Sequence, residues 1–261
     1  MSQRIDKKLV RERFKKSMAH NNYCRNASVQ DMMAEYLLQN LRTCTANRSF
    51  QNIFEQGSGT GILTKKLLSR YDPKSFTGND IVDDSEEYIE KIINDKHPTC
   101  KFNFISGDIE ELTDYPENVD LVISNATIQW LSDTKNYFDN LAANVIQGTF
   151  IAFTTFGTNN LLEINKITST ALNYHTIDTI REILSKKFEI LLLKEDTIKL
   201  QFKTPIEVIR HLRSTGVTGI NRTAWTKKIL ELFSYRYTEL FGNDEGVPLS
   251  YHPIYIIAKR K

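Results

Sequence analysis

A glycine-rich loop between a strand-like run and a helix-like run is the feature that most constrains the fold of this chain. The segment Glu55-Gln56-Gly57-Ser58-Gly59-Thr60-Gly61 follows an apolar run at 50–55 and precedes a run at 62–70 with leucines on one helical face. Glycines let the chain turn sharply and let its backbone approach a ligand without an intervening Cβ. The loop therefore predicts a ligand site at the carboxyl end of the first strand of an α/β sheet.

Strand-like and helix-like runs alternate after this loop. We predict strands at 50–55, 75–80, 101–105, 119–124 and 148–154, with helices at 62–70, near 88–93 and near 137–144. Such alternation predicts a parallel sheet with right-handed crossovers that binds ligands at the carboxyl ends of its strands. The run at 254–259 suits a last strand that lies antiparallel at the edge of the same sheet.

The two ends of the chain lie outside this alternation. Residues 4–42 have helical character with a break near 21–26, and their first part is rich in lysine and arginine. Toward the other end, 188–202 contains two strand-like runs and 204–242 has helical character. We predict a helical N-terminal lid at 1–45, a core at 46–202, an inserted helical cap at 203–250 and the last core strand at 251–261.

Composition excludes several classes of protein. The 261 residues carry a net charge of +2, which argues against a broad cationic surface for nucleic acid. The cysteines Cys24, Cys44 and Cys100 are far apart and show no C-x-x-C spacing, so a disulfide framework or a structural zinc site is not expected. The N-terminus is polar, and no apolar run approaches the roughly 18 residues of a membrane span. We predict a cytoplasmic protein without a metal.

Other uses of a glycine-rich loop fit poorly. A phosphate-binding loop requires G-x-x-x-x-G-K-[ST], but Ile62 stands at the lysine position. A hydrolase nucleophile elbow requires G-x-S-x-G, and Gln56 replaces its first glycine. In the dinucleotide fingerprint G-x-G-x-x-G, the third glycine would stand at Ile62, whereas Gly61 comes one position early. The tighter G-x-G-x-G with Glu55 two residues before it resembles the S-adenosylmethionine-binding loop of Rossmann-like methyltransferases.

Residues after the next three strands fit the same cofactor. Asp80 follows Gly61 by 19 residues, where a carboxylate can accept hydrogen bonds from both ribose hydroxyls. Asp108 follows the third strand and suits the adenine amino group, with a helix N-cap as the alternative. The segment 125–130 follows the fourth strand and suits the methionine end, although its Gln129 and Trp130 also suit ordinary loop and core positions. The predicted cofactor residues are Glu55, Gly57, Ser58, Gly59, Gly61, Asp80, Ile81, Asp108, Ile109, Asn125 and Ala126.

Four motifs spread over nearly the whole chain narrow the family. They are Tyr23-x-x-x-Ala27-x-x-Gln30, the segment Asn125-Ala126-Thr127-Ile128-Gln129-Trp130-Leu131, His211-Leu212-Arg213-x-Thr215-Gly216-Val217 and Tyr251-His252-Pro253-Ile254-Tyr255. Together they resemble the biotin-pathway malonyl-acyl-carrier-protein O-methyltransferases, and the two C-terminal motifs are the most specific. Two departures are a long spacing from Phe14 to Tyr23, which puts the placement of Tyr23 in doubt, and Gln56 at a position that is more often apolar.

This resemblance implies a fold, a reaction and two partners. The fold is a Rossmann-like, mostly parallel seven-stranded α/β sheet flanked by helices. The reaction is methyl transfer from S-adenosylmethionine to the free carboxylate of malonyl-acyl carrier protein, whose methyl ester then enters the synthesis of pimeloyl thioester. Because a carboxylate is already ionised at neutral pH, no general base is required. Alignment of the reacting atoms and exclusion of water are sufficient.

Three residues are candidates for the substrate side of this site. Arg213 suits the malonyl carboxylate, because a guanidinium can donate two parallel hydrogen bonds; a surface position on a helix is the alternative. Tyr23 could close the pocket and steer the substrate, or simply pack the N-terminal helices. His252 could line the pocket, or form a turn before proline together with Tyr251. For the acidic carrier protein, the cationic candidates are the N-terminal basic helix, Arg210, Arg222, Lys227 and Lys228.

Two other functions remain open from the sequence. One is a methyltransferase of the same fold that acts on another small-molecule carboxylate, hydroxyl or amine. The other is a non-catalytic protein that binds S-adenosylmethionine or its product. Methylation of nucleic acid is disfavoured, because no Asn-Pro-Pro-Tyr-type motif follows the fourth strand. We expect a monomer without a membrane or nucleic-acid partner.

Overall fold

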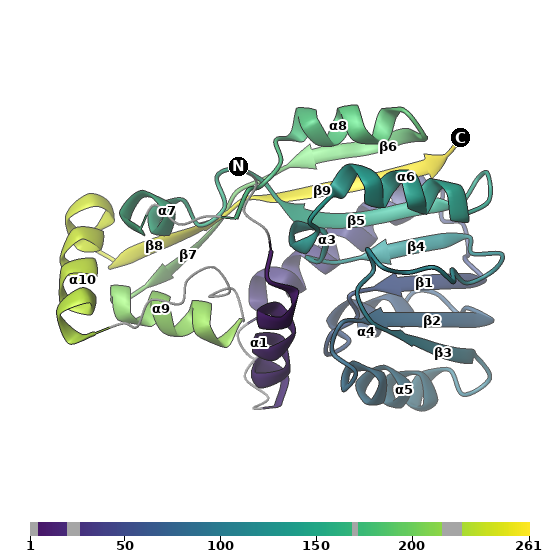
Figure 1. The fold of residues 1–261 in the computed structure, drawn as a ribbon, viewed down its shortest axis with the longest axis horizontal. Helices are drawn as coiled ribbons and strands as arrows, with labels where there is room; N and C mark the ends of the chain where they lie inside the picture. The colour runs from purple at the N-terminus through teal and green to yellow at the C-terminus, as the bar shows by residue number, and fades with distance from the viewer. Residues whose placement is uncertain (1–4, 20–26, 169–171, 216–225) are drawn as a thin grey trace.

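The computed structural model describes residues 5–19, 27–168, 172–215 and 226–261. A seven-stranded sheet of order β3-β2-β1-β4-β5-β9-β6 forms its centre (Figure 1). The strands of this sheet are β1 (Asn52–Gln56), β2 (Ser75–Asp80), β3 (Lys101–Ser106), β4 (Leu121–Ser124), β5 (Phe150–Phe156), β6 (Phe188–Glu195) and β9 (Pro253–Arg260). The pairs from β3 to β5 are parallel, and β9 is antiparallel to both of its neighbours. The predicted Rossmann-like fold is confirmed.

The position of the last strand corrects the sequence prediction. β9 is not an edge strand, because it lies between β5 and β6. Residues 253–258 of β9 are all buried, so this strand requires cover on both faces and a hydrogen-bonding partner on each side. β6 contains partly exposed positions, and it occupies the edge instead.

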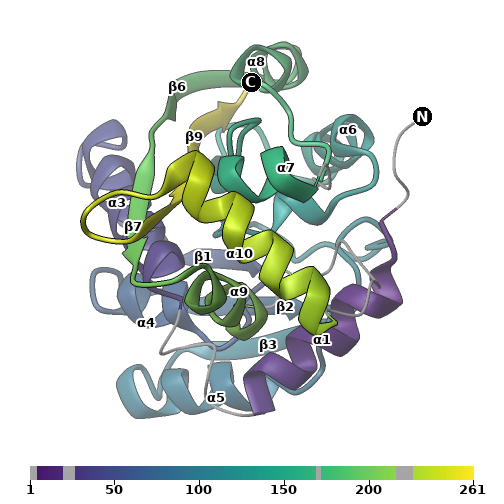
Figure 2. The ribbon, with the colours of Figure 1, turned by 90° about the vertical axis from the view of Figure 1, so that its left-hand side faces the viewer.

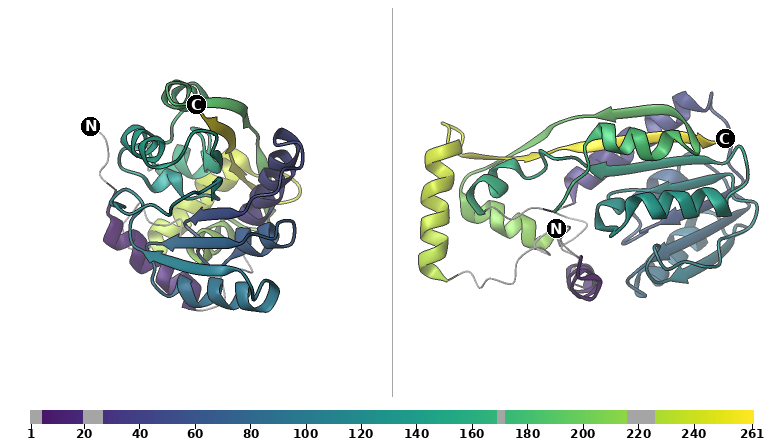
Figure 3. Two further views of the ribbon diagram at one scale, coloured as in Figure 1. Left: turned by 90° about the vertical axis from the view of Figure 1, so that its right-hand side faces the viewer. Right: turned by 45° about the horizontal axis from the view of Figure 1, so that its top comes forward.

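Helices cover both faces of the sheet. One face packs against α3 (Ser28–Cys44), α4 (Ile62–Leu68) and α5 (Ser85–Lys96), and the other against α6 (Thr134–Asn144) and α8 (Ile177–Ser185) (Figure 3). Alternate residues of one strand serve the two cores: Ile53 of β1 belongs to the first hydrophobic cluster and Phe54 to the second. Among the described helices, none has the length and apolar character required to cross a membrane.

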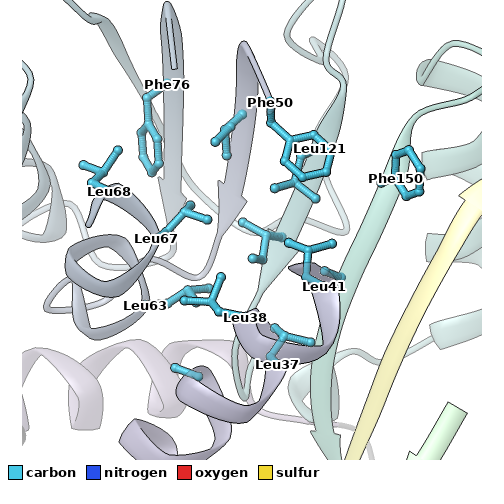
Figure 4. Packing of buried hydrophobic residues seen from close by; sticks show 14 of the residues in the cluster. Leu37, Leu38, Leu41, Phe50, Leu63, Leu67, Leu68, Phe76, Leu121 and Phe150 are labelled. Carbon is cyan, nitrogen blue, oxygen red and sulfur yellow. The ribbon is translucent and has the colours of Figure 1, made fainter. Parts of the chain in front are cut away.

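The core beneath α3 and α4 supports the glycine-rich loop. Figure 4 shows leucines of α3 and α4 converging on aromatic side chains of the sheet, among them Leu37, Leu67 and Phe76. These three side chains have no exposed surface. Because α4 begins directly after the loop, its packing against α3 and the sheet fixes the position of the loop.

A smaller cap stands beyond the carboxyl ends of the parallel strands, on the left in Figure 1 and toward the viewer in Figure 2. It contains α7 (Leu162–Thr168), α9 (Pro205–Ser214), α10 (Lys227–Phe241) and an antiparallel pair of β7 (Ile198–Phe202) with β8 (Val247–Tyr251). The sequence predicted the helical character of 204–242 and the run that forms β7, but it missed β8. Between the cap and the sheet lies α1 (Lys7–Ala19) (Figure 1).

Candidate cofactor and active site

A cavity opens where the parallel strands end. Its floor comes from the loops after β1, β2, β3 and β4, and its roof comes from α1 through Lys7, Val10, Phe14 and Met18. Eight of the predicted cofactor residues line it: Gly57, Gly59, Asp80, Ile81, Asp108, Ile109, Asn125 and Ala126.

The glycine-rich loop takes a conformation that glycine alone adopts easily. Gly57 and Gly59 have φ angles of +68° and +53°, in the left-handed region that favours glycine. A Cβ on Gly57 would collide with the side chain of Thr127, whereas a Cβ on Gly59 would point into open space with nothing within 4 Å. At Gly59, therefore, no side chain separates the loop backbone from the cavity.

Asp80 connects this loop to the end of β2. Its Oδ2 accepts a hydrogen bond of 2.8 Å from the Gly59 N–H, and its Oδ1 accepts one of 2.8 Å from the Val82 N–H. Burial raises the pKa of Asp80 to about 6, although these backbone N–H groups counteract it. Each carboxylate oxygen can accept a further hydrogen bond, so Asp80 can receive hydroxyls from a ligand in the cavity.

The three other predicted cofactor residues, Glu55, Ser58 and Gly61, do not line the cavity. Glu55 is buried and accepts a hydrogen bond of 2.6 Å from the Thr64 hydroxyl. Burial raises the pKa of Glu55 to about 8. Ser58 donates its N–H to the Asn79 carbonyl at 2.9 Å, and a Cβ on Gly61 would collide with Ile92 of α5. All three residues therefore hold the loop against its surroundings, and direct cofactor contact from them stays a prediction.

Asp108 sits at the mouth of the cavity and is tied to α1. The Lys7 ammonium lies 2.8 Å from Asp108 Oδ2 and 2.6 Å from Glu110 Oε2. Asp108 Oδ1 also accepts the Glu110 N–H at 3.1 Å, so its carboxylate caps a turn, but no helix follows it. Burial pushes the pKa of Glu110 upward, yet the hydrogen bonds from Lys7, Ser132 and Asp133 outweigh it and lower this pKa.

Two further ion pairs extend this contact along α1. Arg11 pairs with Asp83, and the Lys15 ammonium lies 2.9 Å from Asp84. Lys7, Arg11 and Lys15 follow each other at intervals of four residues, so they share one side of the helix. We name the pairs of these three cations with Asp108, Glu110, Asp83 and Asp84 the ion-pair ladder. It holds α1 over the cavity, and the function of this helix as a lid stays a prediction.

Asn125 and Ala126 shape the other end of the cavity. Asn125 Oδ1 accepts the Thr154 hydroxyl at 2.6 Å, and Asn125 Nδ2 donates to the Gln30 carbonyl of α3 at 2.9 Å. Ala126 has a φ of +55°, a rare conformation for a residue with a Cβ, and its N–H donates to Thr154 at 2.9 Å. Strain of this kind is concentrated at binding sites, where surrounding contacts enforce it.

The two most specific sequence motifs meet inside the cap. The His211 ring of α9 lies 2.8 Å from the Tyr251 hydroxyl at the end of β8, and both residues are buried. Burial lowers the pKa of His211 and so favours the neutral form of its ring. This contact fixes α9 to the strand that leads into β9.

The structure places two of the predicted substrate residues, Arg213 and His252, outside the cavity lining. His252 is buried: its Nδ1 accepts the Asn159 N–H at 3.1 Å, and its Nε2 lies 3.3 Å from Glu195. It thereby holds the loop after β5. Arg213 is exposed on the last turn of α9. Tyr23 lies outside the described residues. The roles given to these three residues stay predictions.

Arg213 nevertheless lies beside the lid. The next residue, Ser214, accepts a hydrogen bond of 2.6 Å through its carbonyl from the Ser17 hydroxyl of α1. Ser17 precedes Met18, which lines the cavity. The end of α9 and the end of α1 are therefore joined at one side of the cavity.

Sequence reasoning missed the lining residues that come from α1. Val10, Phe14 and Met18 follow at intervals of four residues, so helical periodicity could have identified one inward face. Phe14 packs edge-on against Trp130, with ring centroids 5.7 Å apart, and both rings line the cavity. Trp130 is therefore part of the site rather than an ordinary core residue. In the described part of the chain, no group of three metal-ligating side chains comes together.

Comparisons with known proteins agree with this geometry. Residues 53–148 match the model of a methyltransferase domain. A malonyl-[acyl-carrier protein] O-methyltransferase of Chlorobium luteolum is 39% identical over 256 residues, covering 98% of this chain and 96% of that protein. The protein of the same name from Haemophilus influenzae is 32% identical, covering 98% and 95%.

Solved structures share the fold at low sequence identity. The YcgJ protein of Bacillus subtilis superposes with a TM-score of 0.57 at 13% identity, covering 87% of this chain and 99% of that one. A phosphoethanolamine-type N-methyltransferase of Haemonchus contortus, solved with S-adenosylhomocysteine, gives a TM-score of 0.53 at 16% identity. It covers 87% of this chain and 52% of that one.

Proposed function

This chain belongs to the family of malonyl-[acyl-carrier protein] O-methyltransferases, and we propose that it methylates the free carboxylate of malonyl-acyl carrier protein. The methyl donor is S-adenosylmethionine, and the malonyl methyl ester formed is the primer for pimeloyl thioester, a biotin precursor. The observation that carries this proposal is the cavity at the strand ends, formed by the glycine-rich loop, Asp80, Asp108 and Asn125 and roofed by α1.

The residues of the cavity fit S-adenosylmethionine. The bare backbone at Gly59 permits close approach of a ligand, and the Asp80 carboxylate beside it suits the two ribose hydroxyls. Asp108 and Ile109 would hold the adenine ring, while Asn125 and Ala126 would border the methionine end. When bound, S-adenosylmethionine supplies a methyl group activated by its positive sulfur.

The reaction requires positioning rather than proton transfer. A malonyl carboxylate has lost its proton at neutral pH, so its oxygen can accept the methyl group without a general base. The chain must hold this oxygen in line with the methyl group and keep water out. The α1 lid, through Phe14 and Met18, and Trp130 from the floor supply apolar walls for that purpose.

We assign the malonyl carboxylate to Arg213, which the Ser17–Ser214 hydrogen bond keeps beside the lid. Tyr23, which precedes α3 in the chain, would steer the substrate from the lid side. An effect of His252 on catalysis would come through the loop after β5, because its ring binds Asn159. We further propose that the protein is a cytoplasmic monomer that binds neither membranes nor nucleic acid.

A methyl-transfer assay tests the function. Labelled S-adenosylmethionine is incubated with malonyl-acyl carrier protein, with the unsubstituted carrier and with succinyl-acyl carrier protein. We expect base-labile label on the malonyl form alone, because a methyl ester is hydrolysed by base. Binding of S-adenosylmethionine without transfer to any carrier would contradict the proposed substrate and favour a small-molecule acceptor.

A further inference from the structure

The cap presents an unusual amount of apolar surface to solvent. Eight large hydrophobic side chains are exposed in the described part of the chain, and five of them lie on α9 and α10: Ile206, Ile229, Leu232, Tyr235 and Leu240. Tyr235 is 65% exposed and Leu232 is 52% exposed. Because grouped apolar side chains on a surface mark sites of interaction, the outer side of the cap is suited to a protein partner.

The spacing of these residues places them on outward helical faces. On α10, Lys228, Leu232 and Tyr235 follow at intervals of four and three residues, opposite the buried Phe233 and Tyr237. On α9, Ile206 and Arg210 are four residues apart and exposed, whereas Val208, Ile209 and Leu212 are buried. α9 and α10 pack on one another through a shared apolar cluster. Figure 2 shows both helices on the side of the molecule formed by the cap.

Cations are mixed with these apolar side chains and have no acidic partner among the described residues. No ion pair joins Arg210 or Lys228 to a described carboxylate. α10 also carries two further exposed cations, Lys227 and Arg236, and two exposed carboxylates, Glu231 and Glu239. On α1, by contrast, Lys7, Arg11 and Lys15 are already bound in the ion-pair ladder, and only Lys8 and Lys16 among its lysines are exposed outside it. The cap therefore offers the cations that a docking partner can use.

We propose that the exposed sides of α9 (Ile206 and Arg210) and α10 (Lys228, Leu232 and Tyr235), which we name the docking face, dock the acyl carrier protein; this rests on the proposed function. An acidic partner matches the cations, and an apolar contact beside the charges matches Leu232 and Tyr235. The position also fits, because α9 runs from this face to its hydrogen bond with α1 at the cavity.

Binding and kinetics of charge-reversed variants test this face. Fluorescently labelled carrier protein without a malonyl group is titrated with wild type, with R210E/K228E and with K91E, whose reversed lysine lies on α5 away from the cap (Figure 1). We expect R210E/K228E to raise both the Kd for the carrier and the KM for malonyl-carrier protein at least ten-fold, with kcat within two-fold of wild type. K91E and the conservative variant R210K/K228R should bind like wild type.

Several outcomes would overturn the docking face or separate it from the function. An unchanged Kd and KM in R210E/K228E, or an equal loss in K91E, would overturn it. Dimers of the wild-type chain in sedimentation that R210E/K228E dissociates would assign the face to a second copy instead. Specific carrier binding without methyl transfer by the wild type would leave the docking face in place and refute the proposed function. If R210E/K228E transferred methyl groups to malonyl-carrier protein as well as the wild type does, the docking face would be refuted and the proposed function would stand.

Discussion

Two basic helices, α1 and α9, flank the cavity, and they use their charges in opposite ways. Three cations of α1, Lys7, Arg11 and Lys15, pair with carboxylates of the core. The cations of α9, Arg210 and Arg213, are exposed and have no ion pair with a described residue. A run of lysines and arginines in a sequence therefore does not distinguish a docking surface from a helix that is held in place by ion pairs within the protein. The difference lies in which acidic side chains the fold brings opposite the helix.

The largest expected effect separates the cofactor side from the substrate side. Asp80→Ala removes both acceptors for the ribose hydroxyls, and we expect the affinity for S-adenosylhomocysteine to fall at least about 100-fold, since hydrogen bonds to charged groups contribute about 1.5–3 kcal/mol each. Arg213→Ala should leave that affinity within two-fold and lower kcat/KM for malonyl-carrier protein. Titration calorimetry measures the affinities. Equal losses of affinity in the two variants would remove Arg213 from the substrate side.

The pH dependence of cofactor binding tests the same carboxylate. The pKa of Asp80 is raised to about 6, so its charge is lost as the pH falls below that value. We expect the affinity for S-adenosylhomocysteine to fall about ten-fold from pH 7 to pH 5, as expected for one titrating group. The same shift has the opposite effect on folding. Because the pKa of Asp80 is raised in the folded protein, ionisation of Asp80 lowers the free energy of unfolding as the pH rises through 6. In Asp80→Asn the affinity should be lower and no longer change between pH 5 and 7.

A smaller effect is expected from the ion-pair ladder. Exposed ion pairs contribute about 0.2–1 kcal/mol each, so we expect the variant K7A/R11A/K15A to release S-adenosylhomocysteine about five-fold faster. Added salt should speed release from wild type and have little effect on this variant. Lys8 and Lys16 lie on the same helix and are exposed, which makes K8A/K16A the matched control. Stopped-flow release that is equally fast in both variants would show that total charge matters rather than the ladder.

The smallest effect on activity is expected where α9 is anchored. Tyr251→Phe leaves the buried His211 ring without its 2.8 Å partner, which should lower the free energy of unfolding by about 1–3 kcal/mol. Because this bond is buried, its contribution should not change with salt, unlike that of the ladder on α1. Chemical denaturation at low and high salt measures it. A salt-dependent loss would show that α9 is held by surface charge after all.

Local patterns predicted the parallel part of the sheet and the position of the glycine-rich loop. The glycine-rich loop, the alternation of strands and helices and the spacing to Asp80 are all readable within about 30 residues, and β2 has the predicted bounds. The prediction failed where contacts are distant in sequence. β9 joins β5 across about 100 residues, and β8 was missed because Pro248 interrupts a short run that pairs with β7.

For the candidate site, too, the residues that could be predicted are those with a local sequence signal. Glycines and acidic residues at strand ends carry local signals, so eight of the eleven predicted cofactor residues line the cavity. The lid residues carry only helical periodicity, which does not reveal what the helix covers. For His252 the sequence indicated a place near the site, but its hydrogen bond to Asn159 depends on the loop after β5. Such a contact becomes visible only when the fold is known.

The internal position of β9 has a consequence for folding during synthesis on the ribosome. Strands β1 to β5 can assemble as the chain emerges, since each parallel neighbour is already present. β6 leaves the ribosome before its partner, because the strand that joins it to the sheet is β9, about 60 residues further along the chain. The sheet and the base of the cap therefore close only after β9 has been synthesised, and until then an apolar edge at β5 is exposed to chaperones and to neighbouring nascent chains.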